Sequence, residues 1–509
     1  MNILFITADQ WRGECLSALD HPVVETPNLD KLASGGVLFK KHYAQATPCS
    51  PSRTSLHTGM YLHNHRVCLN GTPFDARNTN WAQETHNAGY KPFLFGYTDT
   101  AKDPRGLSAT DPRLRHYSEP LPGIETETVY ADEVPLNWVD HLRSRGYAIP
   151  STLWDLYAET VEESQSEADH TFPPALKIRS EDHETGYMVN QCIDWIKQQQ
   201  GDWVTHLSIF RPHPPFVAPK PYNNLYNPDQ LDPAHRQDQW QTEAAQHPWL
   251  AYQLGQEKFL APECQDTFNK LKSGYYGLMK EVDDYLGSLF NAIQDLGQWD
   301  DTLIIFTSDH GEQMGDHWLM SKSGYFDSSY HIPLIIRDPR STADSGRGRQ
   351  IESFTENVDI MPTILESLGL EIPGQCDGYS LLPFIENGNA PTGWRSEVHW
   401  EYDFRDILNN NVEKELNLTQ HQCSLNVIRD DHFKYVHFTA LPPLFFDLEK
   451  DPHELNNVAE DPAYGKQVLI YAQKLISWRM NHDDRGLTET YLSENGPVTR
   501  PSPRHRIEL

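Results

Sequence analysis

Polar and ionisable side chains follow four short apolar segments of this chain. The segments are residues 2–10, 91–99, 203–213 and 301–312, and the side chains at their ends are Asp9, Tyr97, His213, Asp309 and His310. Continuous apolar runs that end in turn residues are typical of strands buried on both faces of a sheet. Ligands of open α/β sheets bind where the carboxyl ends of the strands meet. We therefore expect these side chains to assemble into one site.

Two of the segments end in residues that bind metal ions. Asp9 with Gln10, and Asp309 with His310, offer oxygen and imidazole ligands. This set suits a hard or borderline divalent cation, such as Ca²⁺, Mn²⁺ or Mg²⁺, better than a thiol-loving one. Either pair alone would be weak evidence, because a Ser-Asp-His sequence can also cap a helix. Together they predict a site for one divalent metal ion, which would polarise the oxygens of an ester.

A cysteine stands among small hydroxyl residues in TPCSPSRTSLHTG, residues 47–59. Pro51 suits the first turn of a helix, so Cys49 is predicted to lie just ahead of a helix N-terminus. Free amides at that position lower the pKa of a thiol and attract anions. Two other interpretations of Cys49 are an ordinary buried thiol and a thiolate nucleophile with a histidine base.

Segments with a helical pattern, such as 27–36 and 265–297, lie between the apolar strands. The alternation predicts an α/β fold with a large, mixed but mostly parallel sheet flanked by helices. From about residue 377, alternating segments predict a smaller C-terminal domain with an antiparallel sheet. We thus expect a catalytic domain at 1–376 with an aperiodic insertion at 105–182, the smaller domain at 377–482, and an extended arm at 483–509.

Composition restricts the partners and the compartment. The formal net charge of -30 disfavours nucleic acid and anionic membrane surfaces. No apolar run approaches the ~20 residues that cross a bilayer. The seven scattered cysteines fit reduced thiols, and MNILFITADQ has no basic leader of a signal peptide. These features favour a cytoplasmic protein.

The order C-S-P-S-R-T-S-L-H-T-G at 49–59 resembles the signature of the sulfatases. In that family a maturation enzyme oxidises the cysteine to formylglycine. Further segments resemble other motifs of the family: NILFITADQWR, TPNLDKLASGGVLF, RPHPPF, TLIIFTSDHGEQMGDH, DGYSLLPF and FFDLEKDPHELNNVAEDP. The resemblance runs from residue 2 to about residue 460 and implies the fold of the alkaline phosphatase superfamily.

The resemblance also implies roles for single residues. Formylglycine at position 49, once hydrated, would be the oxygen nucleophile and a further ligand of the metal. Arg53 matches the arginine of the signature, whose planar donors suit a tetrahedral oxyanion or a gem-diol. Lys322, in LMSKSGY, matches a family lysine, and His213 matches the P-H-x-P histidine. Both would bind substrate and donate a proton to the leaving group.

GYTDT, YLHNHR and ALPPLFFDLEKDPHE also resemble the phosphonate monoester hydrolases of this family, which cleave sulfate esters too. Typical sulfatases carry G-K-W-H-L-G where this chain has GYTDT, so Tyr97 and Asp99 replace a lysine and a histidine. A less positive site favours substrates with a single negative charge. The phosphonate hydrolase pattern shares the tyrosine but has a threonine in place of Asp99. We expect Tyr97 to bind substrate and Asp99 to act as the base that collapses the hemiacetal.

Residues and resemblance together predict a formylglycine-dependent, metal-assisted hydrolase of sulfate monoesters that also cleaves phosphonate monoesters and phosphodiesters at the same site. The alternative is a phosphonate monoester hydrolase or phosphodiesterase with sulfatase as its side activity. A two-metal phosphodiesterase or mutase would have Ser or Thr at position 49, where this chain has Cys49. A non-catalytic protein on the same scaffold would be expected to have lost some of the site residues.

The predicted partners follow from this function. They are a small-molecule sulfate or phosphonate ester and the maturation enzyme that makes formylglycine, with no nucleic acid and no membrane. The tail from about Asp483 has little apolar content but carries scattered Tyr, Leu and Arg residues. We expect this tail to form an arm that packs on a neighbouring subunit of a homo-oligomer, a dimer or a tetramer.

Overall fold

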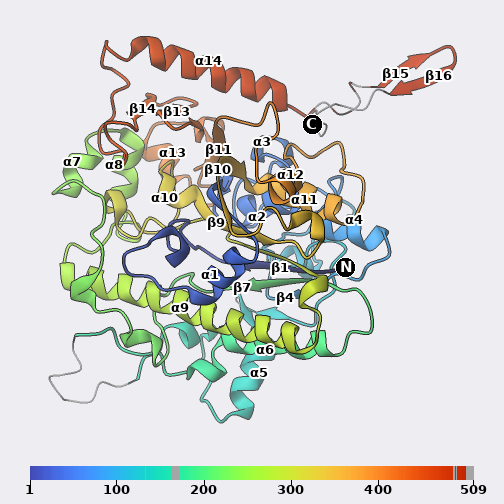
Figure 1. Cartoon of the computed structure of the whole chain (residues 1–509). Coiled ribbons are helices and arrows are strands. Elements are labelled where there is room, and N and C mark those ends of the chain that lie inside the picture. The colour runs from blue at the N-terminus through green and yellow to red at the C-terminus, as the bar shows by residue number, and fades with distance from the viewer. Residues whose placement is uncertain (132, 162–170, 485, 487, 489, 500–509) are drawn as a thin grey trace.

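A seven-stranded mixed sheet forms the centre of the molecule, in the order β10-β2-β9-β8-β1-β7-β4 (Figure 1). The computed structural model describes residues 1–131, 133–161, 171–484, 486, 488 and 490–499. The strands of this sheet are β1 (Asn2–Ala8), β2 (Val37–Tyr43), β4 (Phe93–Phe95), β7 (Val204–Ile209), β8 (Thr302–Thr307), β9 (His331–Arg337) and β10 (Arg349–Glu356). β9 is antiparallel to its two neighbours, and the other neighbouring pairs are parallel. The predicted large, mostly parallel sheet is confirmed.

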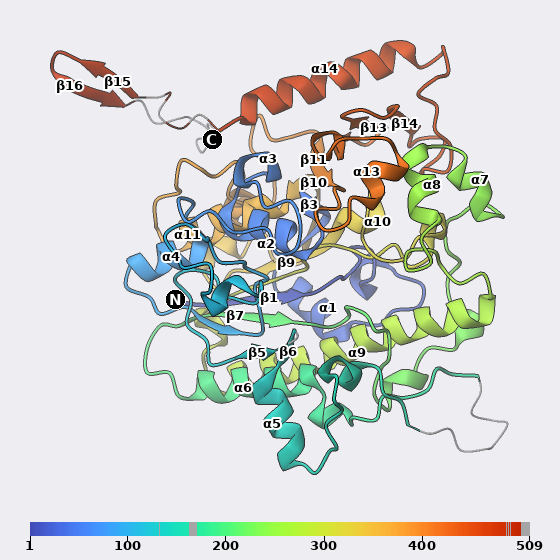
Figure 2. The same cartoon turned by 180° about the vertical axis from the view of Figure 1, so that it is seen from behind.

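Helices cover both faces of this sheet (Figures 1 and 2). Leu4 and Ile6 of β1 belong to the apolar core beside α1 (Pro27–Ser34), α6 (Glu184–Lys197) and α9 (Gln265–Asp295). Ile3 and Phe5 belong to the core of the other face, beside α2 (Cys49–Thr58), α4 (Trp81–Asn87), α11 (Ile360–Ser367) and α12 (Leu382–Asn387). β1 is buried along its whole length, and its central residues 3–6 are all apolar because neither face of the strand meets water.

A second sheet of five strands, in the order β14-β13-β12-β11-β3, builds the C-terminal part. β11 (Val398–Asp403), β12 (Ser424–Arg429), β13 (Phe433–Phe438) and β14 (Leu444–Asp447) pair antiparallel, as predicted, and α14 (Gly465–His482) packs across β12 and β13. β3 (Ala46–Thr47) joins the edge of this sheet parallel to β11. The C-terminal sheet therefore fixes the chain directly before Cys49.

The region predicted as an insertion has a small core of its own. Its described part contains β5 (Tyr130–Ala131), β6 (Val134–Pro135) and α5 (Leu136–Ser144). Trp138, Leu142 and Tyr157 are buried in a separate apolar cluster there. Short elements of this kind leave little periodicity in the sequence, which is why their pattern is weak. Residues 162–170 of the predicted insertion lie outside the described residues.

The described part of the C-terminal arm contains a β-hairpin, β15 (Thr490–Ser493) and β16 (Gly496–Thr499), that projects beyond α14 (Figure 2). Tyr491 and Leu492 of the hairpin are about three-quarters exposed. Its packing on a neighbouring subunit stays a prediction, and residues 500–509 of the arm lie outside the described residues.

We keep the division at residues 376 and 482 as a proposal, with β3 as the strand that links the two sheets. Among the described residues, no helix has both the length and the apolar composition needed to cross a bilayer.

Candidate active site

Four adjacent strands, β8, β1, β7 and β4, run parallel at the centre of the large sheet. Their carboxyl ends therefore meet at one edge. The predicted residues that follow these ends are Asp309 and His310 after β8, Asp9 and Gln10 after β1, His213 after β7, and Tyr97 and Asp99 after β4. Cys49 and Arg53 reach the same edge from the first turns of α2. Chain topology thus brings the dispersed motifs of the sequence into one site.

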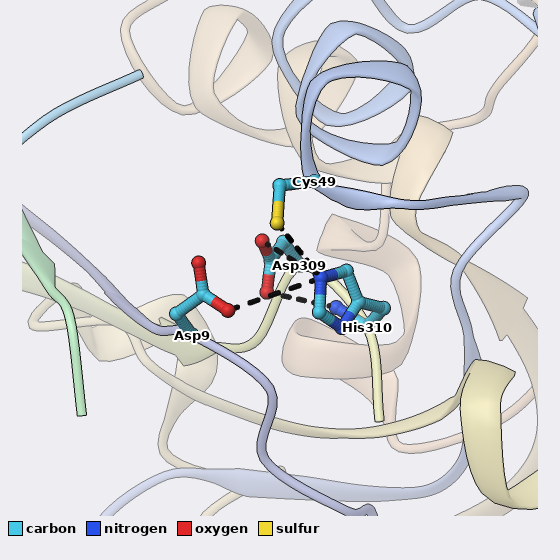
Figure 3. Close-up of side chains that lie close together, drawn as sticks. All are labelled: Asp9, Cys49, Asp309 and His310. Carbon is cyan, nitrogen blue, oxygen red and sulfur yellow. Dashed lines mark hydrogen bonds and ion pairs between the residues drawn. The ribbon is translucent and has the colours of Figure 1, made fainter. Parts of the chain in front are cut away.

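Four buried side chains converge in this site (Figure 3). One ligand atom from each of Asp9, Cys49, Asp309 and His310 lies within 4.8 Å of all the others. His310 Nε2 is 3.3 Å from Cys49 Sγ, 3.4 Å from Asp309 Oδ2 and 3.8 Å from Asp9 Oδ1. Asp9 Oδ1 is buried and has no hydrogen-bond partner among the described residues. A buried carboxylate oxygen without a donor needs a positive partner.

Protonation in the cluster also fits a cation. His310 Nδ1 donates to the carbonyl of Gly311 at 3.1 Å, so its Nε2 carries the lone pair that faces the cluster. Burial, and next the charge of Lys322, lower the pKa of His310 to about 3, which keeps the imidazole neutral. Burial and the nearby Asp9 raise the pKa of Asp309 to about 6. Two crowded carboxylates and a neutral imidazole match a divalent cation such as Ca²⁺, Mn²⁺ or Mg²⁺.

Arg53 is buried behind the two carboxylates. Its Nη2 donates to Asp9 Oδ2 at 2.9 Å and its Nε donates to Asp309 Oδ2 at 3.0 Å. Its Nη1 donates to Ser208 Oγ and to the backbone carbonyl of Tyr97. Most of its donors are therefore engaged by the protein, and Arg53 is absent from the described residues that line the cavity. The structure places its guanidinium in contact with both carboxylates and not on the described lining of the cavity, and substrate binding by Arg53 stays a prediction.

Gln10 links Lys322 to Glu312, a carboxylate that the sequence did not single out. Lys322 Nζ donates to Gln10 Oε1 at 2.7 Å and to Cys49 Sγ at 3.3 Å. Gln10 Nε2 donates to Glu312, whose carboxylate also accepts from the backbone amides of Met314 and Ser321. An ionised carboxylate has no hydrogen to donate, so Glu312 must face the NH₂ group of Gln10. The amide oxygen Oε1 of Gln10 is then turned toward Lys322 and the cluster.

Helix α2 begins at Cys49 itself and has Pro51 in its first turn. The sequence instead predicts the cysteine just ahead of the helix. Ser52 Oγ donates to the backbone carbonyl of Asp309, which holds the helix against the end of β8. The expectation of a lowered thiol pKa is wrong for the unmodified residue. Burial and next the charge of Asp9 raise the pKa of Cys49, outweighing the helix N-terminus. A raised pKa lowers the fraction of thiolate, which disfavours the thiolate-hydrolase interpretation.

The GYTDT segment turns sharply where it leaves β4. Gly96 has φ 96°, and a Cβ there would lie 1.9 Å from the backbone oxygen of Ser208, so only glycine fits. The turn places the Tyr97 ring over the Arg53 guanidinium at 4.3 Å, with its hydroxyl donating to Asp9. Asp99 lies 3.5 Å from Arg53 Nε. Burial raises the pKa of Asp99 to about 7 even though Arg53 acts in the opposite direction.

His213 faces the cavity as a neutral imidazole. Its Nδ1 donates to the carbonyl of Pro214 at 2.8 Å, which leaves Nε2 as an acceptor. Burial and next the charge of Lys322 lower its pKa to about 3. Burial acts to lower the pKa of Lys322, but its charged surroundings, which include Asp9 and Asp309, raise it, so Lys322 stays charged. Lys322 is therefore the better candidate for proton donation.

A cavity of about 80 Å³ opens onto the cluster. Its lining includes several residues that no motif of the sequence predicts, namely Asn70, Tyr117, Ser118, Tyr130, Glu133, Glu184 and Phe210. Asn70 Oδ1 accepts from the backbone amide of Ser50 at 3.0 Å and so caps the first turn of α2. Phe210 stands just before the RPHPPF motif, which could have pointed to it. Tyr117, Tyr130 and Glu133 come from the aperiodic region, where no local signal identifies them.

Comparison with known proteins assigns the family. The sulfatase family model matches residues 1–370, and a model of the C-terminal domain of N-sulphoglucosamine sulphohydrolase matches residues 315–481. The chain belongs to the sulfatase family, within the alkaline phosphatase superfamily, and is a hydrolase. The buried cluster of Asp9, Cys49, Asp309 and His310 is consistent with a sulfatase metal site that includes the catalytic cysteine.

Three relatives resemble the chain over nearly its whole length. It is 40% identical to the multifunctional alkaline phosphatase superfamily protein PehA of Trinickia caryophylli, covering 98% of this chain and 99% of the relative. It superposes on the phosphonate monoester hydrolase of Agrobacterium radiobacter with TM-score 0.92 and 44% identity, covering 98% and 99% of the two chains. The arylsulfatase of Clostridium perfringens is 26% identical, over 96% of each chain. The chain thus lies closer to the phosphonate monoester hydrolases than to this arylsulfatase.

Proposed function

We propose that this protein is a formylglycine-dependent hydrolase of phosphonate monoesters and phosphodiesters, with sulfate monoesters as secondary substrates. This reverses the order of preference predicted from the sequence. The observation that carries it is the charge of the cavity, where Tyr97 and Asp99 stand in place of two basic residues. Among the described lining residues, Lys322 is the one cation. Phosphonate monoesters, phosphodiesters and sulfate monoesters each bear a single negative charge, which a site with few cations favours over the two charges of a phosphate monoester. The order of phosphonate before sulfate is supported by similarity, since the chain is 44% identical to a phosphonate monoester hydrolase and 26% identical to an arylsulfatase.

Each group of the site has a task in such a reaction. A divalent ion held by Asp9, Asp309, His310 and Gln10, with residue 49, would supply Lewis acidity to the ester oxygens. Hydrated formylglycine at position 49 supplies two hydroxyls on one carbon, one of which attacks while the other allows release. The conversion requires a maturation enzyme as partner. Arg53 holds the carboxylates of Asp9 and Asp309 in place through the hydrogen bonds described above.

Lys322 and His213 act on the leaving side of the ester. The Lys322 ammonium donates a proton or a hydrogen bond to the bridging oxygen as the alcohol departs. His213 Nε2, an acceptor in this structure, orients a hydroxyl or a water in the cavity. Tyr97, whose hydroxyl donates to Asp9 Oδ2, lines the cavity and binds the substrate, and Asp99 takes the proton of the second hydroxyl at position 49.

A panel of substrates with one common leaving group tests the proposal. Metal-loaded protein, with conversion of Cys49 verified, is assayed on 4-nitrophenyl esters of phenylphosphonate, methyl phosphate, sulfate and phosphate. We expect kcat/KM to be highest for the phosphonate and the diester, lower for the sulfate and lowest for the doubly charged phosphate. A sulfate value above both would restore the arylsulfatase interpretation, and a preference for phosphate monoester would contradict the charge argument.

Replacing Asp99 by asparagine separates the two halves of the reaction. If its carboxylate removes the proton during release, Asp99→Asn slows release of the acid product on the order of 10²–10⁴-fold and leaves release of the alcohol nearly unchanged. Stopped-flow assays should then show a burst of 4-nitrophenol followed by a slow steady state. Asp103→Asn, in the same loop and paired with Arg105, is the control. Absence of a burst, with higher relative activity on phosphate monoesters, would instead make Asp99 a charge that sets preference.

A further inference from the structure

The cavity has two chemically different ends. At the inner end lie Asp9, Cys49 and Lys322, which belong to the cluster described above. The remaining wall, formed largely by the aperiodic region and the start of α6, carries acidic and aromatic side chains. Since the acid half of an ester occupies the inner end, this outer wall faces the alcohol half. Its chemistry therefore decides which alcohols the enzyme accepts.

Two carboxyl groups on this wall, those of Glu133 and Glu184, are bonded to phenols rather than to cations, whereas Asp99 lies 3.5 Å from Arg53 Nε. Glu133 accepts from the hydroxyl of Tyr117, and Glu184 accepts from the hydroxyl of Tyr157 at 2.7 Å. Neither glutamate forms an ion pair with any described residue. Lys322 is engaged at the inner end by Gln10 and Cys49. Arg211 and Arg53, which are not among the described lining residues, act on Glu184 and Asp99, but Lys322 is the one cation among those lining residues, so the wall presents carboxyl groups to the cavity.

Burial of Glu184 makes its negative charge unfavourable in free energy when no cation is bound. The side chain is almost fully buried at the N-terminus of α6, and desolvation raises its pKa to about 7. Desolvation also raises the pKa of Asp99, another lining residue, to about 7, although Arg53 acts in the opposite direction. A bound cation would favour the charged form of both carboxyls, as an opposite charge within a few ångströms does.

Aromatic groups and one free hydroxyl complete the wall. Tyr117, Tyr130 and Phe210 line the cavity together with the carboxyl groups. The hydroxyl oxygen of Tyr130 is buried and has no hydrogen-bond partner among the described residues. Aromatic rings attract ammonium groups through their faces, and a phenol oxygen accepts an N–H bond. A primary ammonium has three donors for such a set of acceptors.

We propose that the outer wall, made of Glu133, Glu184, Asp99 and Tyr130, binds a primary ammonium group on the alcohol half of the ester. The preferred substrates are then zwitterionic phosphonate or phosphate esters of small amino alcohols. The small cavity volume of about 80 Å³ favours a short chain between the ester oxygen and the nitrogen. This inference rests on the proposed function, because it concerns the alcohol half of the same ester.

The test compares two esters of nearly equal size. Hydrolysis of 2-aminoethyl methylphosphonate and n-propyl methylphosphonate is followed by phosphorus NMR with metal-loaded, converted enzyme. The small methyl group leaves the alcohol as the only part that reaches the outer wall. We expect the wild-type ratio of kcat/KM to favour the aminoethyl ester at least tenfold. Glu133→Gln and Glu184→Gln should each reduce this ratio on the order of tenfold, because each removes a charge that faces the ammonium.

The two alcohols differ in acidity, but this difference affects the ratio of kcat/KM equally in every variant. A change in the ratio between variants therefore reports only on the wall. Glu352→Gln, an exposed glutamate paired with Lys40, is the matched control and should keep the wild-type ratio. If the ratio of kcat/KM for the two esters is unchanged in both cavity variants, the inference is overturned. Hydrolysis of 4-nitrophenyl phenylphosphonate by the same enzyme would still uphold the proposed function. Loss of that hydrolysis in wild type would overturn both. Faster turnover of the 2-(trimethylammonio)ethyl ester than of the aminoethyl ester would overturn the assignment to a primary ammonium.

Discussion

Replacing Cys49 by alanine should abolish turnover while the protein keeps its fold and its metal. Alanine removes the precursor of the nucleophile, and the loss of a nucleophile that forms a covalent bond is not compensated by binding alone. The other three members of the cluster stay in place and continue to bind the ion. Activity on 4-nitrophenyl phenylphosphonate should fall at least 10³-fold, with metal content by elemental analysis and the melting temperature close to wild type.

Cys49→Ser sharpens this prediction. Serine offers one hydroxyl where hydrated formylglycine offers two, so attack is allowed but the route of release is lost. We expect at most one equivalent of 4-nitrophenol per site, followed by no turnover. In the wild-type protein, the peptide that contains position 49 should lack sulfur and react with a hydrazide. An alkylatable thiol in fully active enzyme, or steady turnover by the alanine variant, would contradict the formylglycine mechanism.

Asp309→Asn should lose both the metal ion and the activity. The carboxylate contributes negative charge to the cluster and also fixes its geometry, because Asp309 Oδ1 accepts from the backbone amides of Gln10 and His310. Loss of a ligating carboxylate should weaken metal binding more than 100-fold, beyond the 10–100-fold typical of outer partners. The increase in melting temperature that added metal produces in wild type should then disappear.

Asp338→Asn is the control for this variant. Asp338 is also buried and pairs with an arginine, Arg340, but it lies outside the cluster. It should bind metal as wild type does, whatever its effect on stability. Full metal occupancy of Asp309→Asn, or equal loss in the control, would show that the ligand set is wrong or that the effect is general destabilisation.

The sequence alone determined the parts of this protein whose signals are local. β1 and β8 are continuous apolar runs because helices cover both faces of the sheet, and each run ends in its polar pair. The apolar pattern predicted the strands, and the ends of the strands predicted that Asp9, Asp309 and His310 would meet. The signature around Cys49 depends on adjacent residues, so no knowledge of distant contacts was needed. The antiparallel C-terminal sheet followed from alternation for the same reason.

Only the tertiary structure decided the features that depend on contacts between distant segments. Glu312 meets Gln10 across some three hundred residues of sequence, and no spacing predicts it. Burial against Asp9 raises the pKa of Cys49, whereas the helix N-terminus alone would lower it. Tyr130, Glu133 and Glu184 form the outer wall of the cavity although they come from different elements. Long-range packing and desolvation create these properties, and neither leaves a periodic pattern in the chain.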